Sequence, residues 1–232
     1  MSRYDKAKVK IIKPCERTKK LEEVCRRLWE NNFDDSTEYI SFYFSDRWKE
    51  STTIIYGEES MLHLNPYRMQ LFGSEKTIYY IVGVCTDKAY RHRGYMDALL
   101  RESFRYLYEK DAPFVYLMPA DEKIYLPYDF TNVYTVNSFE IVSRNGERKN
   151  IDNKLLAAGY DKIAQNEIKA AFYAEMSSNE IEIIGYDELS EEQKSEFIIR
   201  SEKIMSEIFD CYVKRDEFYF EQKNREMKAC GG

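Results

Sequence analysis

The chain is poor in the residues that build metal centres and hydrolase triads. It has only two histidines, His63 and His92, and five cysteines that are spread along 232 residues without a C-x-x-C pair. Because zinc sites need clustered Cys and His ligands, we expect no metal site and interpret the cysteines as reduced, packed side chains. A Ser-His-Asp or Cys-His hydrolase is also hard to assemble here, since His92 lies inside a basic loop.

Long apolar runs and a surplus of basic residues are missing as well. No segment approaches the roughly 18 apolar residues of a membrane span, and the first residues contain no apolar stretch of signal-peptide length. The 35 Lys and Arg are outnumbered by 41 Asp and Glu, which gives a net charge of −6. Nucleic-acid-binding domains usually carry a basic excess. We therefore expect a cytoplasmic chain without a membrane or nucleic-acid partner.

Apolar periodicity predicts a mixed α/β layer over roughly residues 1–145. Strands are expected at 9–12 and 51–57, and as a hairpin that turns at Gly73–Lys76. One helical face carries Leu21, Val24, Cys25 and Leu28, and a second helix is expected over Tyr95–Lys110. The aromatic-rich segment 37–48 is either another helix or a surface that closes over something. Residues 113–118 read as a strand buried on both faces, and 133–143 as a further strand.

The polar segment 143–153 predicts a domain boundary. We expect a first domain over 1–145, a linker with a helix over 146–180, and the start of a second, incomplete unit over 181–232. That unit would begin with a strand at 181–186, and the capping-box spacing of Ser190–Gln193 predicts the helix after it.

Basic residues and a glycine lie between the predicted strand and helix in "GVCTDKAYRHRGYMDALL", residues 83–100. The first N–H groups of a helix have no partner within the helix, and the helix dipole makes that end positive. Gly94 allows close approach to the backbone, and Arg91 and Arg93 add charge. This combination favours a phosphate or pyrophosphate, although an ordinary basic loop before a helix is common.

The run V-x-T-x(4)-R-x-R-G-Y resembles motif A of the GNAT superfamily of N-acetyltransferases, whose usual pattern is R/Q-x-x-G-x-G/A. Arg91 and Gly94 match its first and fourth positions, while Met96 departs from the sixth. With "HLNPY", "PFVYLMPADEKIYLPYDF" and "YVKRDEFYFEQKNREMKACGG", the chain is similar to the Eis-like (enhanced-intracellular-survival) bacterial group, but it lacks that group's C-terminal portion.

The resemblance implies a GNAT fold, which is a mixed, mostly antiparallel twisted sheet flanked by helices, with acetyl-CoA as co-substrate and no metal. It implies cofactor contacts from the strand end (Val84, Cys85, Thr86), the loop and helix start (Arg91, His92, Arg93, Gly94, Tyr95, Met96, Asp97) and a later turn (Ala120, Asp121). It also implies Tyr125, in "IYLPYDF", as the general acid that protonates the CoA thiolate after an amine attacks the thioester.

The acceptor side stays open. We expect a small-molecule amine acceptor, with a non-catalytic CoA- or partner-binding module as the alternative and homo-oligomer formation undecided. Asp121 and Glu122 either border the amine site or lie on a solvated surface. His63 either faces the acceptor or is structural, and core packing is favoured over acceptor binding for Tyr39, Phe42, Tyr43, Phe44 and Trp48. Cys85 has no obvious partner base, which argues against a covalent intermediate.

Overall fold

The computed structural model describes residues 5–133, 141–142, 148–149 and 185–230. By its contacts the chain divides into two compact units: Met1–Met118 together with Glu191–Gly232, and Pro119–Ser190. The domain boundaries expected at 145 and 180 stay predictions. The start of a second GNAT-like unit at 181 stays a prediction, because its expected strand lies largely outside the described residues, as does the helix expected in the linker.

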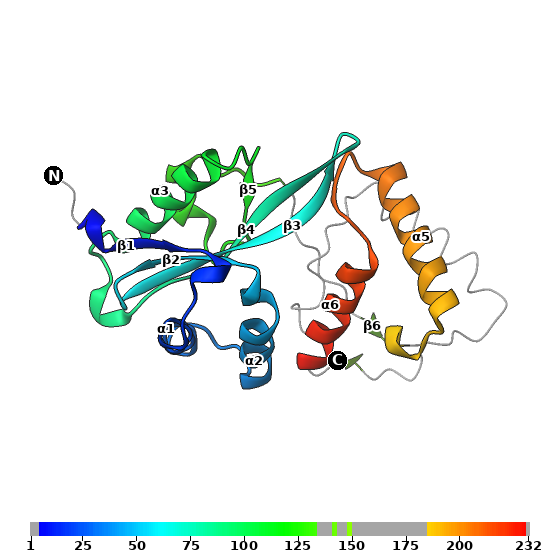
Figure 1. Ribbon diagram of the computed structural model, residues 1–232, viewed down its shortest axis with the longest axis horizontal. Helices are drawn as coiled ribbons and strands as arrows, with labels where there is room; N and C mark the ends of the chain where they lie inside the picture. The colour runs from blue at the N-terminus through cyan, green and yellow to red at the C-terminus, as the bar shows by residue number, and fades with distance from the viewer. Residues whose placement is uncertain (1–4, 134–140, 143–147, 150–184, 231–232) are drawn as a thin grey trace. The chain divides into compact units, whose positions relative to one another are not determined.

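The first unit is built on one twisted sheet of mixed but mostly antiparallel strands, as expected. Its strands β1 (Val9–Ile12), β2 (Thr52–Tyr56), β3 (Ser60–Leu71), β4 (Ser74–Thr86) and β5 (Val115–Tyr116) follow in the order β1-β2-β3-β4-β5. All neighbours are antiparallel except β4 and β5. Helix α3 (Tyr95–Tyr108) covers one face, and α1 (Lys19–Glu30) and α2 (Thr37–Ser45) cover the other (Figure 1).

Capping residues and apolar spacing explain the two helices on the second face. The side chain of Thr18 accepts a hydrogen bond from the Leu21 N–H at the start of α1, and Ser36 accepts one from the Tyr39 N–H at the start of α2. The predicted face of α1 is buried against the sheet. The sequence left segment 37–48 open between a helix and a surface that closes over something. It forms helix α2, followed by a short 3-10 turn, η3 (Arg47–Lys49).

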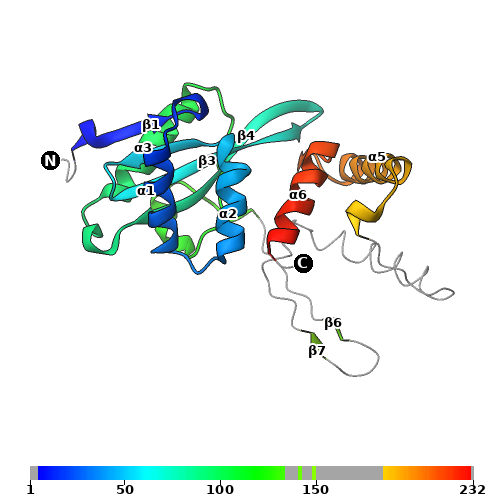
Figure 2. The ribbon, with the colours of Figure 1, turned by 60° about the horizontal axis from the view of Figure 1, so that its bottom comes forward.

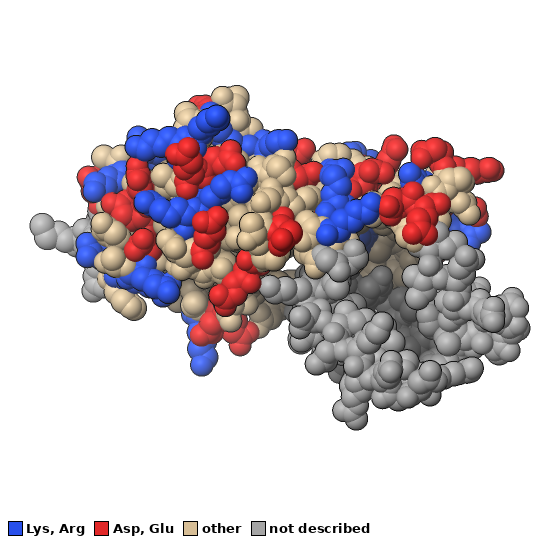
Figure 3. All heavy atoms as spheres, turned by 90° about the horizontal axis from the view of Figure 1, so that it is seen from below, with Lys and Arg blue, Asp and Glu red and all other residues tan. Residues whose placement is uncertain are grey.

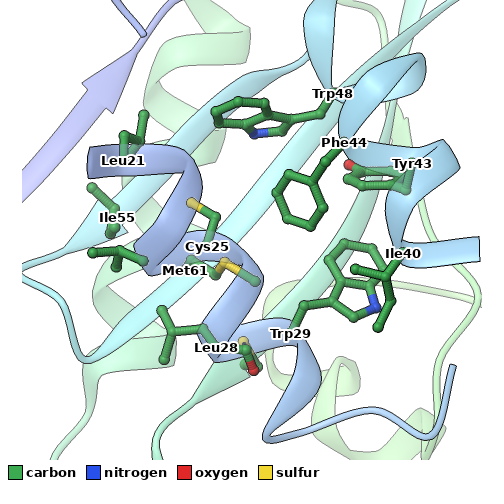
Figure 4. Packing of buried hydrophobic residues seen from close by; sticks show 12 residues of the cluster. Leu21, Cys25, Leu28, Trp29, Ile40, Tyr43, Phe44, Trp48, Ile55 and Met61 are labelled. Atoms are coloured by element: carbon green, nitrogen blue, oxygen red, sulfur yellow. Dashed lines mark hydrogen bonds between the residues drawn. The ribbon is translucent and has the colours of Figure 1, made fainter. Parts of the chain in front are cut away.

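The core between these helices and the sheet is rich in aromatic side chains, as Figure 4 shows. Tyr43, Phe44 and Trp48 are each at most 3% exposed. The rings of Tyr43 and Phe44 pack against Trp29, and Trp48 packs against Phe44. Core packing, which the sequence favoured over acceptor binding, is thus confirmed for these three residues.

Strand β5 differs from its expectation. It spans two residues only, both half-buried, whereas the apolar run predicted a strand buried on both faces. The reason is its place at the end of the sheet, where it pairs with β4 alone. Of the strand expected over 133–143, only β6 (Ile141–Val142) is described, paired with β7 (Arg148–Lys149).

The C-terminal segment returns to the first unit. It contains α5 (Glu191–Ile208), which begins directly after Ser190 as predicted, then β8 (Cys211–Val213) and α6 (Glu217–Ala229). Strand β8 pairs with the far end of β3. Asp46, at the end of α2, accepts hydrogen bonds from Gln222 (3.1 Å) and Arg225 (2.7 Å) of α6. Figure 2 shows α6 on the α2 side of the sheet.

Candidate functional site

A β-bulge interrupts β4 three residues before its end. The register runs from His63 opposite Val82 to Met61 opposite Cys85, so one extra residue of β4 is accommodated beside Leu62. Gly83 lies in this bulge with φ of +64°, a left-handed conformation that favours glycine. A Cβ there would lie 2.8 Å from the Trp29 ring and 3.1 Å from the His63 ring. An isolated glycine in a strand pattern is a known sign of a bulge, and it could have predicted this one.

The bulge lies where β4 and β5 separate. In the described part of the chain, β5 pairs with β4 only through Val115 opposite Tyr79 and Tyr116 opposite Tyr80. From Ile81 to Thr86, this edge of β4 therefore presents backbone groups without a neighbouring strand among the described residues. Open edges of this kind can bind an extended molecule through main-chain hydrogen bonds. The predicted contact residues Val84, Cys85 and Thr86 all lie on this segment.

The loop after β4 brings the remaining predicted loop residues together at the start of α3. After the short turn η4 (Lys88–Tyr90), His92 has φ of +62° and Gly94 has φ of +82°. The first helical hydrogen bond runs from the Ala98 N–H to the Gly94 oxygen at 3.0 Å, so the N–H groups of Tyr95 and Met96 precede it. A left-handed conformation at a non-glycine residue such as His92 is uncommon and is often found at ligand-binding loops.

The two loop arginines form no ion pair with a carboxylate among the described residues. Arg91 donates to the Thr86 oxygen (3.2 Å) and to Asn32 Oδ1 (2.8 Å), which ties the loop to β4 and to the chain between α1 and α2. Arg93 donates to the Ala89 oxygen (3.2 Å) and stacks over the Tyr90 ring. Both side chains are exposed, and all three acceptors are neutral. The loop therefore offers two exposed arginine side chains beside a helix N-terminus, which suits an anion.

Cys85 is not a nucleophile in this structure. It is 7% exposed, and burial raises the pKa of its thiol to about 12. Its Sγ lies 3.8 Å from the Leu28 oxygen and donates to it. A thiol in this state is neutral at physiological pH and weakly nucleophilic, which agrees with the expectation of a packed strand residue.

His63 is structural. It is fully buried, with its Nδ1 3.0 Å from Thr53 Oγ1. Burial, together with the charge of Arg17, lowers its pKa to about 3. Thr53 Oγ1 also accepts a hydrogen bond from Trp48 Nε1 at 2.9 Å, so this hydroxyl links the His63 and Trp48 rings. The imidazole is thus neutral, and it fills the space beside Gly83.

Tyr125 and the predicted turn belong to the other unit. Tyr125 is half-buried between the 3-10 turns η5 (Glu122–Ile124) and η6 (Leu126–Tyr128), with its ring centroid 5.7 Å from that of Phe130. Burial raises the pKa of its hydroxyl above the ordinary value of 10, so it carries its proton at neutral pH. Asp121 caps η5 by accepting from the Lys123 N–H (3.0 Å), and it is exposed like Ala120 and Glu122. Contact of these residues with the cofactor loop stays a prediction.

Other site types find no support among the described residues. No group of three or more His, Cys, Asp or Glu side chains there could hold a metal ion. No helix in the same ranges combines the length and apolarity needed to cross a membrane. Basic and acidic side chains lie interspersed on the face that Figure 3 shows.

Comparison with known proteins identifies the family of this arrangement. Residues 16–133, just over half of the chain, match the family model described as "Acetyltransferase (GNAT) domain". No curated protein matches the chain.

Solved structures match at low identity. A probable N-acyltransferase from Enterococcus faecalis is 18% identical over 52% of this chain and 31% of its own, with a TM-score of 0.44. A GNAT family acetyltransferase from Brucella melitensis in complex with acetyl-CoA is 16% identical over 53% of this chain and 83% of its own, with a TM-score of 0.43. The chain thus spans about a third of the length of the Enterococcus protein.

Proposed function

The chain belongs to the GNAT acetyltransferase family, and on that premise we propose that it transfers the acetyl group of acetyl-CoA to a small-molecule amine. One observation carries the proposal. The bulged, open-edged end of β4 runs directly into a loop with two left-handed residues and then into the N-terminus of α3. An extended thiol ester can pair with such a strand edge while its phosphates lie on the helix N-terminus.

We assign the acyl and pantetheine arm to the backbone of Val84, Cys85 and Thr86. The pyrophosphate is assigned to the backbone N–H groups from His92 to Asp97, with Arg91 and Arg93 supplying charge. Met96 at the sixth position of the motif leaves this assignment intact, because the backbone and not the side chain would bind. Ala120 and Asp121 are assigned to a turn that contacts the cofactor, by the resemblance alone.

The chemistry is direct attack of a neutral amine on the thioester carbonyl carbon. The new C–N bond forms as the C–S bond breaks, the leaving thiolate takes the hydroxyl proton of Tyr125, and the amine loses its extra proton to solvent. One finding argues against a covalent acyl-enzyme at Cys85, and a second agrees with Tyr125 as the acid. The Cys85 thiol is buried and neutral, and the raised pKa of Tyr125 keeps it protonated as a general acid requires. The Eis-like branch is proposed from the sequence motifs.

Charge reversal in the loop tests the cofactor assignment. Arg91→Glu and Gly94→Glu should each abolish acetyl-CoA binding in isothermal calorimetry, because each places a carboxylate where the pyrophosphate is assigned. Lys110→Glu, beyond the other end of α3, is the matched control and should bind like the unaltered protein. Unchanged affinity in both loop variants would remove the pyrophosphate assignment.

Removal of one hydroxyl tests the general acid. Tyr125→Phe should lower kcat by about a hundredfold, within the usual range for one acid–base group, and leave acetyl-CoA binding unchanged. The assay is thiol release from acetyl-CoA against a panel of amines. Tyr108→Phe, at an exposed tyrosine of α3, is the control. Full activity of Tyr125→Phe would show that another group protonates the thiolate.

A further inference from the structure

Arg47 is a buried arginine that forms no ion pair with any carboxylate of the described residues. It begins η3, directly after α2, and is 7% exposed. Its Nη1 donates to Gln222 Oε1 of α6, while its Nη2 has no hydrogen-bond partner. No described carboxylate lies within the 4.0 Å of an ion pair. Arginine is almost never this buried unless it is paired, because removing an unpaired charge from water is costly.

The acidic groups around Arg47 already hold other cations. Asp46 Oδ1 accepts from Gln222 Nε2 at 3.1 Å, and its Oδ2 accepts from Arg225 Nε at 2.7 Å. On helix α6, Glu226 forms an ion pair with Lys223, with 2.7 Å between Oε2 and Nζ. Among the described residues, the guanidinium of Arg47 therefore directly contacts only the amide of Gln222 and an aromatic ring, while the Asp46 carboxylate acts on its charge from beyond ion-pair distance.

The aromatic ring is that of Tyr67, and it lies between Arg47 and the point where β4 and β5 separate. The guanidinium carbon lies 4.4 Å from the centroid of Tyr67 on β3. The Tyr67 centroid is in turn 6.3 Å from that of Tyr80 and 6.2 Å from that of Tyr116. Tyr80 and Tyr116 are the last paired residues of β4 and β5. A single tyrosine thus lies between the Arg47 guanidinium and the point where β4 and β5 separate, to which the acyl arm is assigned.

We propose that Arg47 binds the carboxylate of the acceptor, so that the substrate is an amine that also carries a carboxylate, such as an α-amino acid. The inference rests on the proposed acetyl transfer. Guanidinium and carboxylate groups match in geometry, and the hydrogen bond from Nη1 and the stack on Tyr67 hold the guanidinium plane in place. Arg47 Nη2 is shielded from solvent, so a carboxylate can reach it only when a side chain that covers it moves aside. An amine with only positive charges would be repelled by Arg47.

The experiment compares amino acids with their α-amides as acceptors of the full chain in the thiol-release assay. Each pair shares the amine and differs in the carboxylate. Because the amide has the less basic amine, and therefore more of the reactive neutral form, intrinsic reactivity favours the amide. We expect at least one acid to exceed its amide in kcat/KM by about tenfold or more, the range of a charge-assisted hydrogen bond.

Variants at Arg47 link the preference to this residue. Arg47→Gln should raise KM for the acid about tenfold and leave the amide within about twofold, while Arg47→Lys should keep part of the preference. Lys49→Gln, an exposed lysine of the same turn, is the matched control. Melting temperatures of all variants establish that they fold.

The outcomes separate this inference from the proposed function. Equal use of acids and amides, equal losses in Arg47→Gln, or acetyl-CoA binding without turnover of any carboxylate-bearing amine would each refute a carboxylate site at Arg47. Turnover of amines that lack a carboxylate would leave acetyl transfer standing in each case. Failure to bind acetyl-CoA in calorimetry would refute the proposed function itself, and this inference with it.

Discussion

Replacing Gly83 with alanine should destabilise the protein through two separate effects. Gly83 has φ of +64°, and a left-handed conformation costs a residue with a Cβ about 1–2 kcal/mol. The new Cβ would also lie 2.8 Å from the Trp29 ring and 3.1 Å from the His63 ring. Both rings are almost fully buried, and overpacking of this kind costs typically about 1–3 kcal/mol.

The matched control is Gly73→Ala at the β3–β4 turn. Gly73 has φ of +78°, and its added Cβ would meet nothing within 4 Å. It therefore carries the conformational cost alone. We expect Gly83→Ala to lose about 2–5 kcal/mol and Gly73→Ala about 1–2 kcal/mol, so that the difference measures the packing against Trp29 and His63.

Urea unfolding followed by tryptophan fluorescence measures both losses, and calorimetry with acetyl-CoA measures the effect on the site. Gly83→Ala should also weaken acetyl-CoA binding, because the bulge shapes the strand edge to which the acyl arm is assigned, whereas Gly73→Ala should not. Equal destabilisation by the two variants would refute the view that Trp29 and His63 fix the bulge. Normal acetyl-CoA affinity in a destabilised Gly83→Ala would separate the bulge from cofactor binding.

Two further predictions concern pH. The pKa of His63 is lowered from 6.5 to about 3, so the unfolded chain takes up a proton there below pH 6.5 that the folded chain does not. Stability should therefore fall by up to about 1.4 kcal/mol per pH unit between pH 6.5 and about 3, and His63→Gln should flatten this slope in urea titrations at pH 7 and 5; parallel slopes would contradict it. Because burial raises the pKa of Tyr125 above 10, kcat should not decline with rising pH until beyond pH 10, and an earlier decline that Tyr125→Phe abolishes would contradict this environment.

The elements with strong local patterns were predictable from the sequence. The apolar face of α1, the helical spacing of apolar residues in α3 and the capping-box spacing before α5 each depend on residues within a few turns of one another. Strand β5 was overestimated because the apolar run at 113–118 also fits a strand buried on both faces, and only its neighbours in the sheet decide between these interpretations. The pairing of β8 with β3 joins residues about 140 positions apart, and no local pattern predicts such a pairing.

The same distinction explains the site. Residues 83–97 form one continuous stretch, so glycine, charge and the strand-to-helix order are all readable in sequence, and the resemblance to motif A adds the ligand. Asn32, which holds Arg91, was missed because it lies 59 residues away in the chain. Nothing in the sequence around Asn32 indicates that it contacts Arg91.

The acceptor side depends on contacts of still longer range. Arg47 reads in sequence as one more basic residue in "FSDRWKE", and its charge appears matched by Asp46 beside it. Only the fold shows that Asp46 is held by Gln222 and Arg225, some 175 residues further along, and that no carboxylate among the described residues forms an ion pair with Arg47. Specificity for the acceptor is therefore expected to change when α6 changes, even if every residue of the cofactor loop is kept. Gln222→Leu tests this directly, since it should weaken use of a carboxylate-bearing amine and leave acetyl-CoA binding intact.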